Sequence, residues 1–219
     1  SGHAYQMHLD LYPHHLATWS RPVLEAAIRR RVQTAYLGNG LVLARILGRH
    51  KIFLRSTDRG FACHLMLDGF WEMWLTQFLA RQVKPGMTVI DVGANFGYFT
   101  LLLGDAVGAS GQVIAVEPNP ETAGLLRETV VLNGHGGRTR IADKALTDSG
   151  DRISIGVCRY TTCVELRAAQ IGAPAWNLLV FQASCLADLG HVDQLGAFQA
   201  PNGPDIYERG GPQTEAAQR

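Results

Sequence analysis

Long apolar runs and an excess of charge are both missing from this sequence. No run approaches the roughly 18–20 apolar residues of a membrane-spanning helix, and the first residues lack a basic segment followed by an apolar one. The 20 Lys and Arg nearly balance the 19 Asp and Glu, leaving a formal net charge of +1. Proteins that hold phosphate backbones usually carry a basic excess. We therefore expect a cytoplasmic protein with neither a membrane nor a nucleic acid as partner.

Paired cysteines are also missing. The four cysteines are Cys63, Cys158, Cys163 and Cys185, and they form no C-x-x-C pair and have no His at metal-binding spacing. A chain of 219 residues is large enough to fold without disulfide staples. We expect reduced thiols and no metal site.

The composition is that of a folded α/β protein. Hydrophobic residues make up 47% of the chain and charged residues 18%, which excludes a disordered polyelectrolyte. We predict an N-terminal helical and hairpin extension over residues 1–84 and an α/β domain over residues 85–200. The Pro/Gly-rich residues 201–219 lack apolar periodicity and are predicted to form an irregular tail.

In the extension, helical spacing predicts helices over residues 22–34 and 70–83. Short β-prone runs over residues 51–55 and 61–67 flank a Gly-containing connection of hairpin length, which predicts an antiparallel ribbon. Four aromatic residues are expected in the core rather than against a substrate: Trp71, Trp74, Phe78 and Phe96.

Strand and helix patterns alternate from residue 87 onward. Strands are predicted over residues 87–92, 112–117 and 138–143, with helices over 97–107 and 120–132 between them. Two consecutive β-α units build a parallel sheet with helices on its faces. The fold class is therefore α/β, with a doubly wound, Rossmann-like sheet.

Further strands are predicted over residues 153–157 and 178–183. The first strand of the parallel sheet would otherwise expose unpaired backbone groups at its edge. We expect residues 177–183 or 195–198 to pair there, or two chains to associate as a homo-oligomer.

A glycine-rich turn follows the first strand of the parallel sheet. Asp91 stands near the end of that strand, and Gly93 and Gly97 flank the turn into the next helix. Glycines let the backbone approach a ligand, and a helix N-terminus presents unpaired N–H groups. The spacing differs from the dinucleotide G-x-G-x-x-G, and Asp91 would repel a pyrophosphate. A cationic or zwitterionic ligand fits better.

A second acid ends the next strand. Glu117 in the run VIAVEPNP can accept both hydroxyls of a ribose, as an acid in this place does in nucleoside-binding doubly wound folds. Together with Asp91 and the glycine turn, it predicts S-adenosylmethionine as the cofactor.

These motifs resemble the FkbM-type family of S-adenosylmethionine-dependent methyltransferases. The matching runs are DGFWE, VKPGMTVIDVGANFGYFTLLL, GQVIAVEPNP, VVLNG and KALTD, and the resemblance covers about residues 51–190. It implies a set of cofactor-binding residues: Glu72, Asp91, Gly93, Ala94, Asn95, Gly97, Glu117, Pro118, Asn119 and Asp143. Within that set the loop residues would line the methionine half, Glu117 the ribose, and Asn119 or Asp143 the adenine edge. Glu72 would reach the loop from the preceding helix.

The resemblance fails near the C-terminal end. Family members continue into a strand resembling V-D-x-I-K-I-D-x-E-G, whereas here residues 191–193 start that pattern and its later acids are missing. A changed reading frame, a truncation or true divergence would each give this sequence. No catalytic residue is assigned, although a general base could be His64, His135 or His191.

The resemblance implies O-methylation of a sugar or secondary-metabolite hydroxyl, with a small molecule or glycan as acceptor. Because the acidic strand is missing, the alternative is a non-catalytic domain that binds S-adenosylmethionine or serves as a scaffold. A nucleic-acid methyltransferase would need a basic groove that the balanced charge does not offer.

Overall fold

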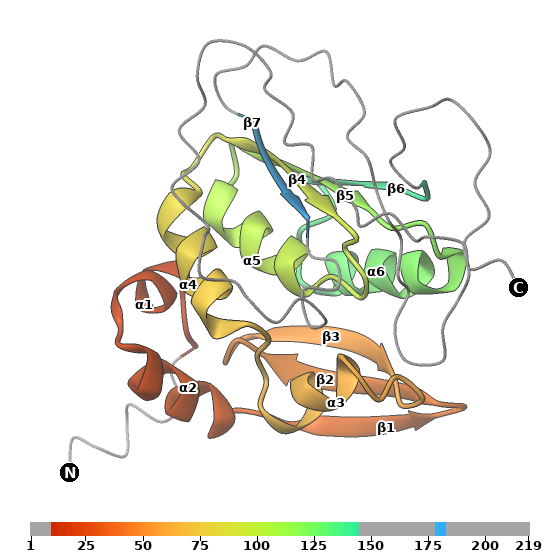
Figure 1. The fold of residues 1–219 in the computed structure, drawn as a ribbon. Coiled ribbons are helices and arrows are strands. Elements are labelled where there is room, and N and C mark those ends of the chain that lie inside the picture. Colours follow the sequence, from red (N-terminus) through yellow and green to blue (C-terminus); the bar gives the residue numbers. More distant parts are fainter. Residues whose placement is uncertain (1–9, 145–177, 183–219) are drawn as a thin grey trace, which may run out of the picture. The chain divides into compact units, whose positions relative to one another are not determined.

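The computed structural model describes residues 10–144 with their side chains and residues 178–182 as backbone (Figure 1). The chain divides into two units, Ser1–Leu186 and Ala187–Arg219, and every described residue lies in the first. The predicted strand over residues 153–157, the segment 195–198 and the tail 201–219 lie outside the described residues. The division into residues 1–84, 85–200 and 201–219 therefore stays a prediction.

The chain begins with two short helices and a three-stranded antiparallel sheet. Helix α1 spans Pro13–Thr18 and α2 spans Arg21–Arg29, with Pro22 in its first turn. The strands are β1 (Thr34–Gly38), β2 (Leu41–Ile46) and β3 (His50–Arg55), in the order β1-β2-β3. Alternate residues of β2 and β3 are buried, so one face of this sheet packs on the core.

The predicted hairpin partner of residues 51–55 is wrong. Residues 61–67 form helix α3 (Ala62–Leu67) instead of a strand, and β3 pairs with β2. The reason lies in the connection, where the Asp58 carboxylate accepts the backbone N–H groups of Gly60 and Phe61 and so starts a helical turn. Ala62 and Leu65 then share a buried face at helical spacing.

Helix α4 spans Met73–Gln82 within the predicted range 70–83. Leu75 and Leu79 are buried, but Trp74 and Phe78 are 41% and 49% exposed. The expectation that these two aromatic residues belong to the core is therefore wrong. They lie four residues apart on the face of α4 that points away from the core.

A four-stranded parallel sheet follows, in the order β6-β5-β4-β7. Its strands are β4 (Thr88–Val92), β5 (Gln112–Val116), β6 (Thr139–Ala142) and β7 (Leu178–Gln182). The order reverses at β4, because β5 and β6 lie on one side and β7 on the other. Open α/β sheets bind their ligands in the crevice at such a switch point.

Two helices connect these strands, α5 (Tyr98–Val107) and α6 (Pro120–Leu132). Val89 and Val113 pack with the α5 side chains in the main core, and Ala115 packs with Leu126 of α6. Ile90, Val92 and Val116 point to the opposite face and form a separate apolar cluster. Within residues 10–144, both connecting helices therefore lie on the same face. This arrangement confirms a Rossmann-like sheet.

The pairing of β7 with β4 confirms the prediction for residues 177–183. β7 runs parallel to β4 in register from Thr88 opposite Leu178 to Val92 opposite Gln182. The strand that carries the glycine turn is therefore an interior strand of the sheet. None of the helices formed by the described residues is long and apolar enough to cross a membrane.

Candidate cofactor site and the comparisons with known proteins

The glycine turn lies at the carboxyl end of β4, at the switch point of the sheet. Three of its residues adopt left-handed backbone conformations: Gly93 (φ 73°), Asn95 (φ 52°) and Gly97 (φ 104°). The N–H groups of Gly93 and Ala94 both donate to the carbonyl of Val116, at 2.9 and 3.0 Å. The turn is therefore fastened to the end of β5, next to Glu117.

Asp91 is fully buried beneath this turn. Its Oδ2 accepts the Thr100 hydroxyl at 2.5 Å, whereas its Oδ1 is buried without a hydrogen-bond partner. Burial raises the pKa of Asp91 to about 7, the negative charge of Glu117 adds to this rise, and the Thr100 hydrogen bond opposes it. A buried carboxylate oxygen without a partner is costly, so Asp91 is suited to a cationic ligand group.

Glu117 is held between the two loops that end β4 and β5. Its Oε2 accepts the N–H of Asn95 and its Oε1 accepts the N–H of Asn119, both at 2.9 Å. Burial raises the pKa of Glu117, and these two backbone hydrogen bonds lower it in part. Each carboxylate oxygen keeps a second lone pair. The carboxylate is thus fixed in place with acceptor capacity to spare.

Glu72 has an unusual backbone for a non-glycine residue. It precedes α4 with φ 37° and ψ 64°, and its half-buried carboxylate has no hydrogen-bond or ion-pair partner among the described residues. Burial raises the pKa of Glu72. Burial also raises the pKa of Tyr98 at the start of α5, and the charge of Glu72 adds a smaller contribution. Glu72 therefore approaches the helix that follows the glycine turn. Strained backbone of this kind often marks a functional position.

The residues predicted for the adenine edge are already engaged in other contacts. The side-chain oxygen of Asn119 caps α6 by accepting the N–H groups of Glu121 and Thr122. Asp143 pairs with Arg127 at the surface, and that hydrogen bond lowers the pKa of Asp143. Pro118 is half-buried between Glu117 and Asn119. Asn119 therefore has only its side-chain amide N–H₂ group to offer a ligand, whereas the carboxylate of Glu117 is held in place with lone pairs to spare.

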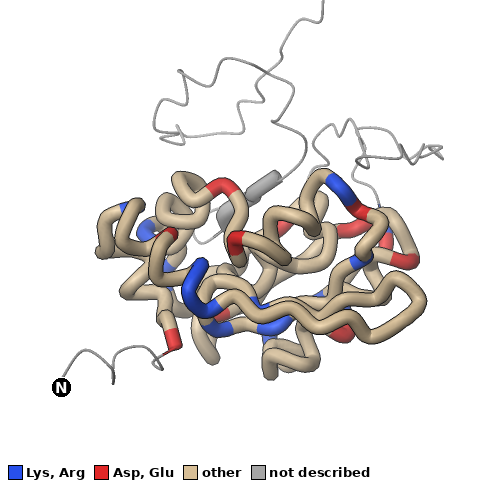
Figure 2. Tube along the Cα trace, turned by 90° about the horizontal axis from the view of Figure 1, so that it is seen from below, with Lys and Arg blue, Asp and Glu red and all other residues tan. Residues whose placement is uncertain are grey.

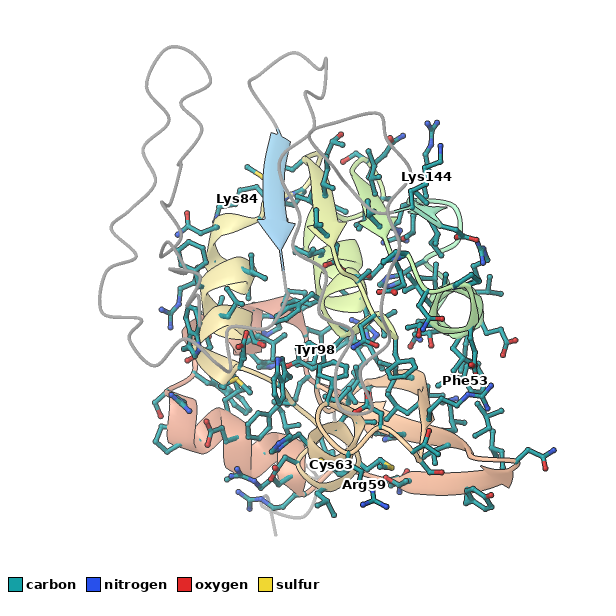
Figure 3. All side chains as sticks on the ribbon, turned by 45° about the vertical axis from the view of Figure 1, so that its right-hand side comes forward. Phe53, Arg59, Cys63, Lys84, Tyr98 and Lys144 are labelled. Atoms are coloured by element: carbon teal, nitrogen blue, oxygen red, sulfur yellow. The ribbon has the colours of Figure 1, made fainter. Side chains whose placement is uncertain are left out.

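Aromatic side chains join the extension to the glycine turn. Phe61 stacks on Phe96 of the turn at 6.5 Å between ring centroids and meets Trp71 edge-on at 5.3 Å. The ring of the exposed His64 lies 5.1 Å from the ring of Trp71, measured between centroids. Phe96 is buried, as predicted. Tyr98 lies in the interior (Figure 3), where its hydroxyl bonds that of Thr76 at 2.9 Å. The extension therefore forms one wall beside the turn.

Sequence reasoning missed a buried ionic cluster around Asp105. Its carboxylate contacts Arg49 at 2.8 Å, His50 at 2.9 Å and His135 at 3.2 Å. Burial alone would raise the pKa of Asp105, but the hydrogen bonds from His135 and His50 and the charges of His50 and Arg49 hold it well below its usual range. The cluster joins three distant parts of the sequence, namely Arg49 with His50, Asp105, and His135, so no spacing could reveal it. His135 is thus a buried hydrogen-bond partner of Asp105 rather than a free base.

The structure also bears on thiols and metals. Cys63 is a free cysteine whose thiol donates to the carbonyl of Arg59 at 2.9 Å. The other three cysteines and His191 lie outside the described residues. Within the part of the chain that the structure describes, no three His, Cys, Asp or Glu side chains are grouped so that they could hold a metal ion.

The cofactor-site residues fall inside a match to a known family model. Residues 71–135 match protein-L-isoaspartate(D-aspartate) O-methyltransferase. Protein-L-isoaspartate O-methyltransferase 1 of Arabidopsis thaliana is 47% identical over 45 residues, which are 20% of each chain. Ribosomal RNA large subunit methyltransferase E of Acinetobacter baumannii is 37% identical over 87 residues, covering 33% of this chain and 40% of the relative.

These matches support a class I methyltransferase. Its cofactor is S-adenosylmethionine, as predicted from Asp91, Glu117 and the glycine turn. A solved S-adenosylmethionine-dependent methyltransferase from Aquifex aeolicus is 28% identical, with a TM-score of 0.31 over 36% of this chain and 40% of that one. The chain spans between a fifth and two-fifths of the length of the curated relatives described above.

The comparisons also correct the prediction of the partners. A small-molecule or glycan acceptor and the exclusion of nucleic acid were expected, whereas the named relatives are methyltransferases of protein isoaspartate and of ribosomal RNA. The exclusion rested on the net charge of the whole chain, which says nothing of how charge is distributed along it.

Proposed function

We propose that this chain transfers a methyl group from S-adenosylmethionine to a macromolecular acceptor. The observation that carries the proposal is the presence of two acids, Asp91 and Glu117, at the switch point of the sheet. One acid has a buried oxygen without a partner, and the other is fixed by two backbone N–H groups. The family match over residues 71–135 supports this interpretation, because it includes both acids.

The residues present fit the two halves of the cofactor. The Asp91 Oδ1 atom can accept a hydrogen bond from the methionine ammonium group, which would relieve its unpaired state. The left-handed Gly93 leaves the backbone open to a ligand because it carries no side chain. Glu117 can accept the ribose hydroxyls with the lone pairs that Asn95 and Asn119 leave free. Glu72 is the further acid that we assign to the methionine half.

When bound, S-adenosylmethionine supplies a methyl group on a sulfonium, a strongly activated donor. The protein's task is therefore to hold donor and acceptor in line and to exclude water from the site. Asp91 and Glu117 fix the two ends of the donor. The wall of Phe61, Trp71 and Phe96 shields one side of the glycine turn from solvent.

The FkbM-type resemblance and the cytoplasmic location remain predictions from the sequence. The Gly-x-Trp-Glu element supports the former, because it places the strained Glu72 directly before α4. The alternative of a non-catalytic binding domain keeps the same cofactor site and differs in turnover.

Calorimetric titration with S-adenosylhomocysteine and a methyl-transfer assay test the proposal together. Wild-type protein should bind the product, and Asp91→Asn should bind it at least about 10-fold more weakly because a neutral amide replaces the partner of the ammonium. Asp10→Asn, an exposed acid at the start of the described chain, is the matched control. Equal binding by both variants would contradict the role of Asp91. Binding without any methyl transfer would support the non-catalytic alternative.

A further inference from the structure

Positive charge is concentrated in the N-terminal extension. Residues 21–59 hold nine Arg and Lys but only two acids, Glu25 and Asp58, whereas the rest of the chain holds 11 Arg and Lys and 17 acids. The net charge of +1 therefore conceals a strongly basic segment. Figure 2 views the described residues from the side of the three-stranded sheet and shows Lys and Arg segments gathered there.

Several of these cations are already neutralised. Arg21 and Arg29 pair with Glu25, and Arg29 also pairs with Asp68. Arg49 pairs with Asp105, and Arg55 with Glu121.

Other cations are left without an acid. Among the cations of residues 21–59, four form no ion pair with another described residue: Arg30, Arg45, Lys51 and Arg59. Arg30 only donates to the carbonyl of Ala26 in its own helix. These side chains remain available to an external anion.

Two of the unpaired cations lie side by side on one face of the sheet. Arg45 of β2 is the register partner of Lys51 of β3, and the next row on that face pairs Leu43 with Phe53. The alternate residues of β2 and β3 are buried, so this row points away from the core. The segment that follows α2 adjoins β2, because the Arg45 N–H donates to the carbonyl of Gln33 at 2.8 Å. Arg45 and Lys51, with Arg30 three residues before Gln33, make up what we call the basic face.

The basic face and the cofactor site belong to the same packed unit. The core face of the sheet contacts α3, and Phe61, directly before α3, stacks on Phe96 of the glycine turn. Arg59, two residues before Phe61, is a further exposed cation that forms no ion pair with another described residue.

We propose that the basic face binds the phosphate backbone of a single-stranded RNA, which would be the acceptor of the methyl group. This inference rests on the proposed function. Cations that form no ion pair are the usual footprint of phosphate binding, and Leu43, two residues from Arg45 on the same face of β2, offers an apolar contact to a base. A protein acceptor does not by itself require a surface that is rich in cations and poor in acids.

Fluorescence anisotropy with a labelled 20-nucleotide single-stranded RNA tests the inference at several salt concentrations. The test variant carries Arg30→Ala, Arg45→Ala and Lys51→Ala. The control variant carries Lys84→Ala, Arg140→Ala and Lys144→Ala, three exposed cations of the parallel-sheet part. Removing three phosphate contacts should weaken RNA binding by about 10-fold or more at low salt and reduce the slope of log K against log salt by about 2. The control should bind RNA as the wild type does.

Two further arms make the outcome decisive. A peptide of equal length containing isoaspartate is titrated in parallel, and S-adenosylhomocysteine binding is measured for every variant. Equal loss of RNA binding in both triple variants, no RNA binding by the wild type, or a preference for the peptide would each overturn the inference. Failure of all variants to bind S-adenosylhomocysteine would instead contradict the proposed function. The comparison of RNA binding between the two triple variants would still test the basic face.

Discussion

The side chain of Asn133 binds both backbone groups of Lys51. Its Oδ1 accepts the Lys51 N–H at 3.0 Å, and its Nδ2 donates to the Lys51 carbonyl at 2.6 Å. One turn earlier, the Thr129 hydroxyl accepts the N–H of Phe53 at 3.1 Å. The end of α6 thus takes the place of a neighbouring strand along the edge of β3. These bonds join the extension to the parallel-sheet part.

Asn133→Ala should lower the free energy of unfolding by about 2 kcal/mol, because it removes both hydrogen bonds and leaves the backbone groups of Lys51 exposed. Urea denaturation monitored by circular dichroism measures the change. The conservative Asn133→Asp keeps one acceptor and should lose less. Glu128→Ala, an exposed change on the same helix, serves as control. If Asn133→Ala matches this control, the bonds to Lys51 contribute nothing to stability.

Gly97→Ala should destabilise the protein and abolish S-adenosylhomocysteine binding. Gly97 has φ 104°, which strains any side chain, and an added Cβ would lie 2.6 Å from the buried Leu126 side chain, which would have to shift. Gly124 lies within α6 with no atom within 4 Å of an added Cβ. Gly124→Ala should therefore be neutral or stabilising by up to about 1 kcal/mol. Thermal unfolding distinguishes the two, and similar melting temperatures would refute the steric explanation.

Asp91 should make the ligand-free protein less stable as the pH rises. Its pKa is raised from 3.8 to about 7, so the folded state holds a proton that the unfolded state has released. The free energy of unfolding should fall between about pH 4 and pH 7. Asp91→Asn should remove much of this slope and raise stability at pH 8 by on the order of 2 kcal/mol. Urea denaturation across that pH range measures it, and an unchanged slope would contradict the assignment.

The Asp105 cluster predicts the opposite pH dependence. The pKa of Asp105 is lowered, so its stabilising contribution is present above the ordinary carboxyl pKa of 3.8 and is lost as the pH falls through the lower folded value. Asp105→Asn should cost about 3 kcal/mol at neutral pH, because it leaves His50, His135 and Arg49 without their anion. The difference from wild type should shrink below about pH 4. Asp10→Asn is the control, and a loss that does not depend on pH would point to packing alone.

The elements of the parallel-sheet part could be predicted from the sequence because the patterns that indicate them are local. Alternating strand and helix patterns, the glycine turn and the acid that ends the second strand are short patterns, and the structure confirms the elements they predicted. The position of β7 followed from the need to cover the edge of β4. Glycine spacing and strand ends are set by backbone geometry, which nearby residues determine.

The extension could not be predicted in the same way. All four residues from Thr34 to Leu37 in β1 are exposed, and β2 carries apolar residues on both faces, so neither strand shows a clean alternation. Residues 61–67 are β-prone by composition but follow the turn that Asp58 begins. The Asp105 cluster and the Asn133 bonds depend on tertiary contacts between distant residues. The basic face was hidden because only the total charge was considered.

The most direct test of the cofactor site is a calorimetric titration of S-adenosylhomocysteine into wild type, Glu117→Ala and Glu128→Ala. Glu117→Ala removes the acceptor of two ribose hydrogen bonds, each worth about 1.5–3 kcal/mol to a charged group, so its dissociation constant should rise by at least about 10-fold. Glu128→Ala makes the same change at an exposed position of α6 and should bind like the wild type. Unchanged affinity in Glu117→Ala, with wild-type thermal stability, would contradict the placement of the cofactor.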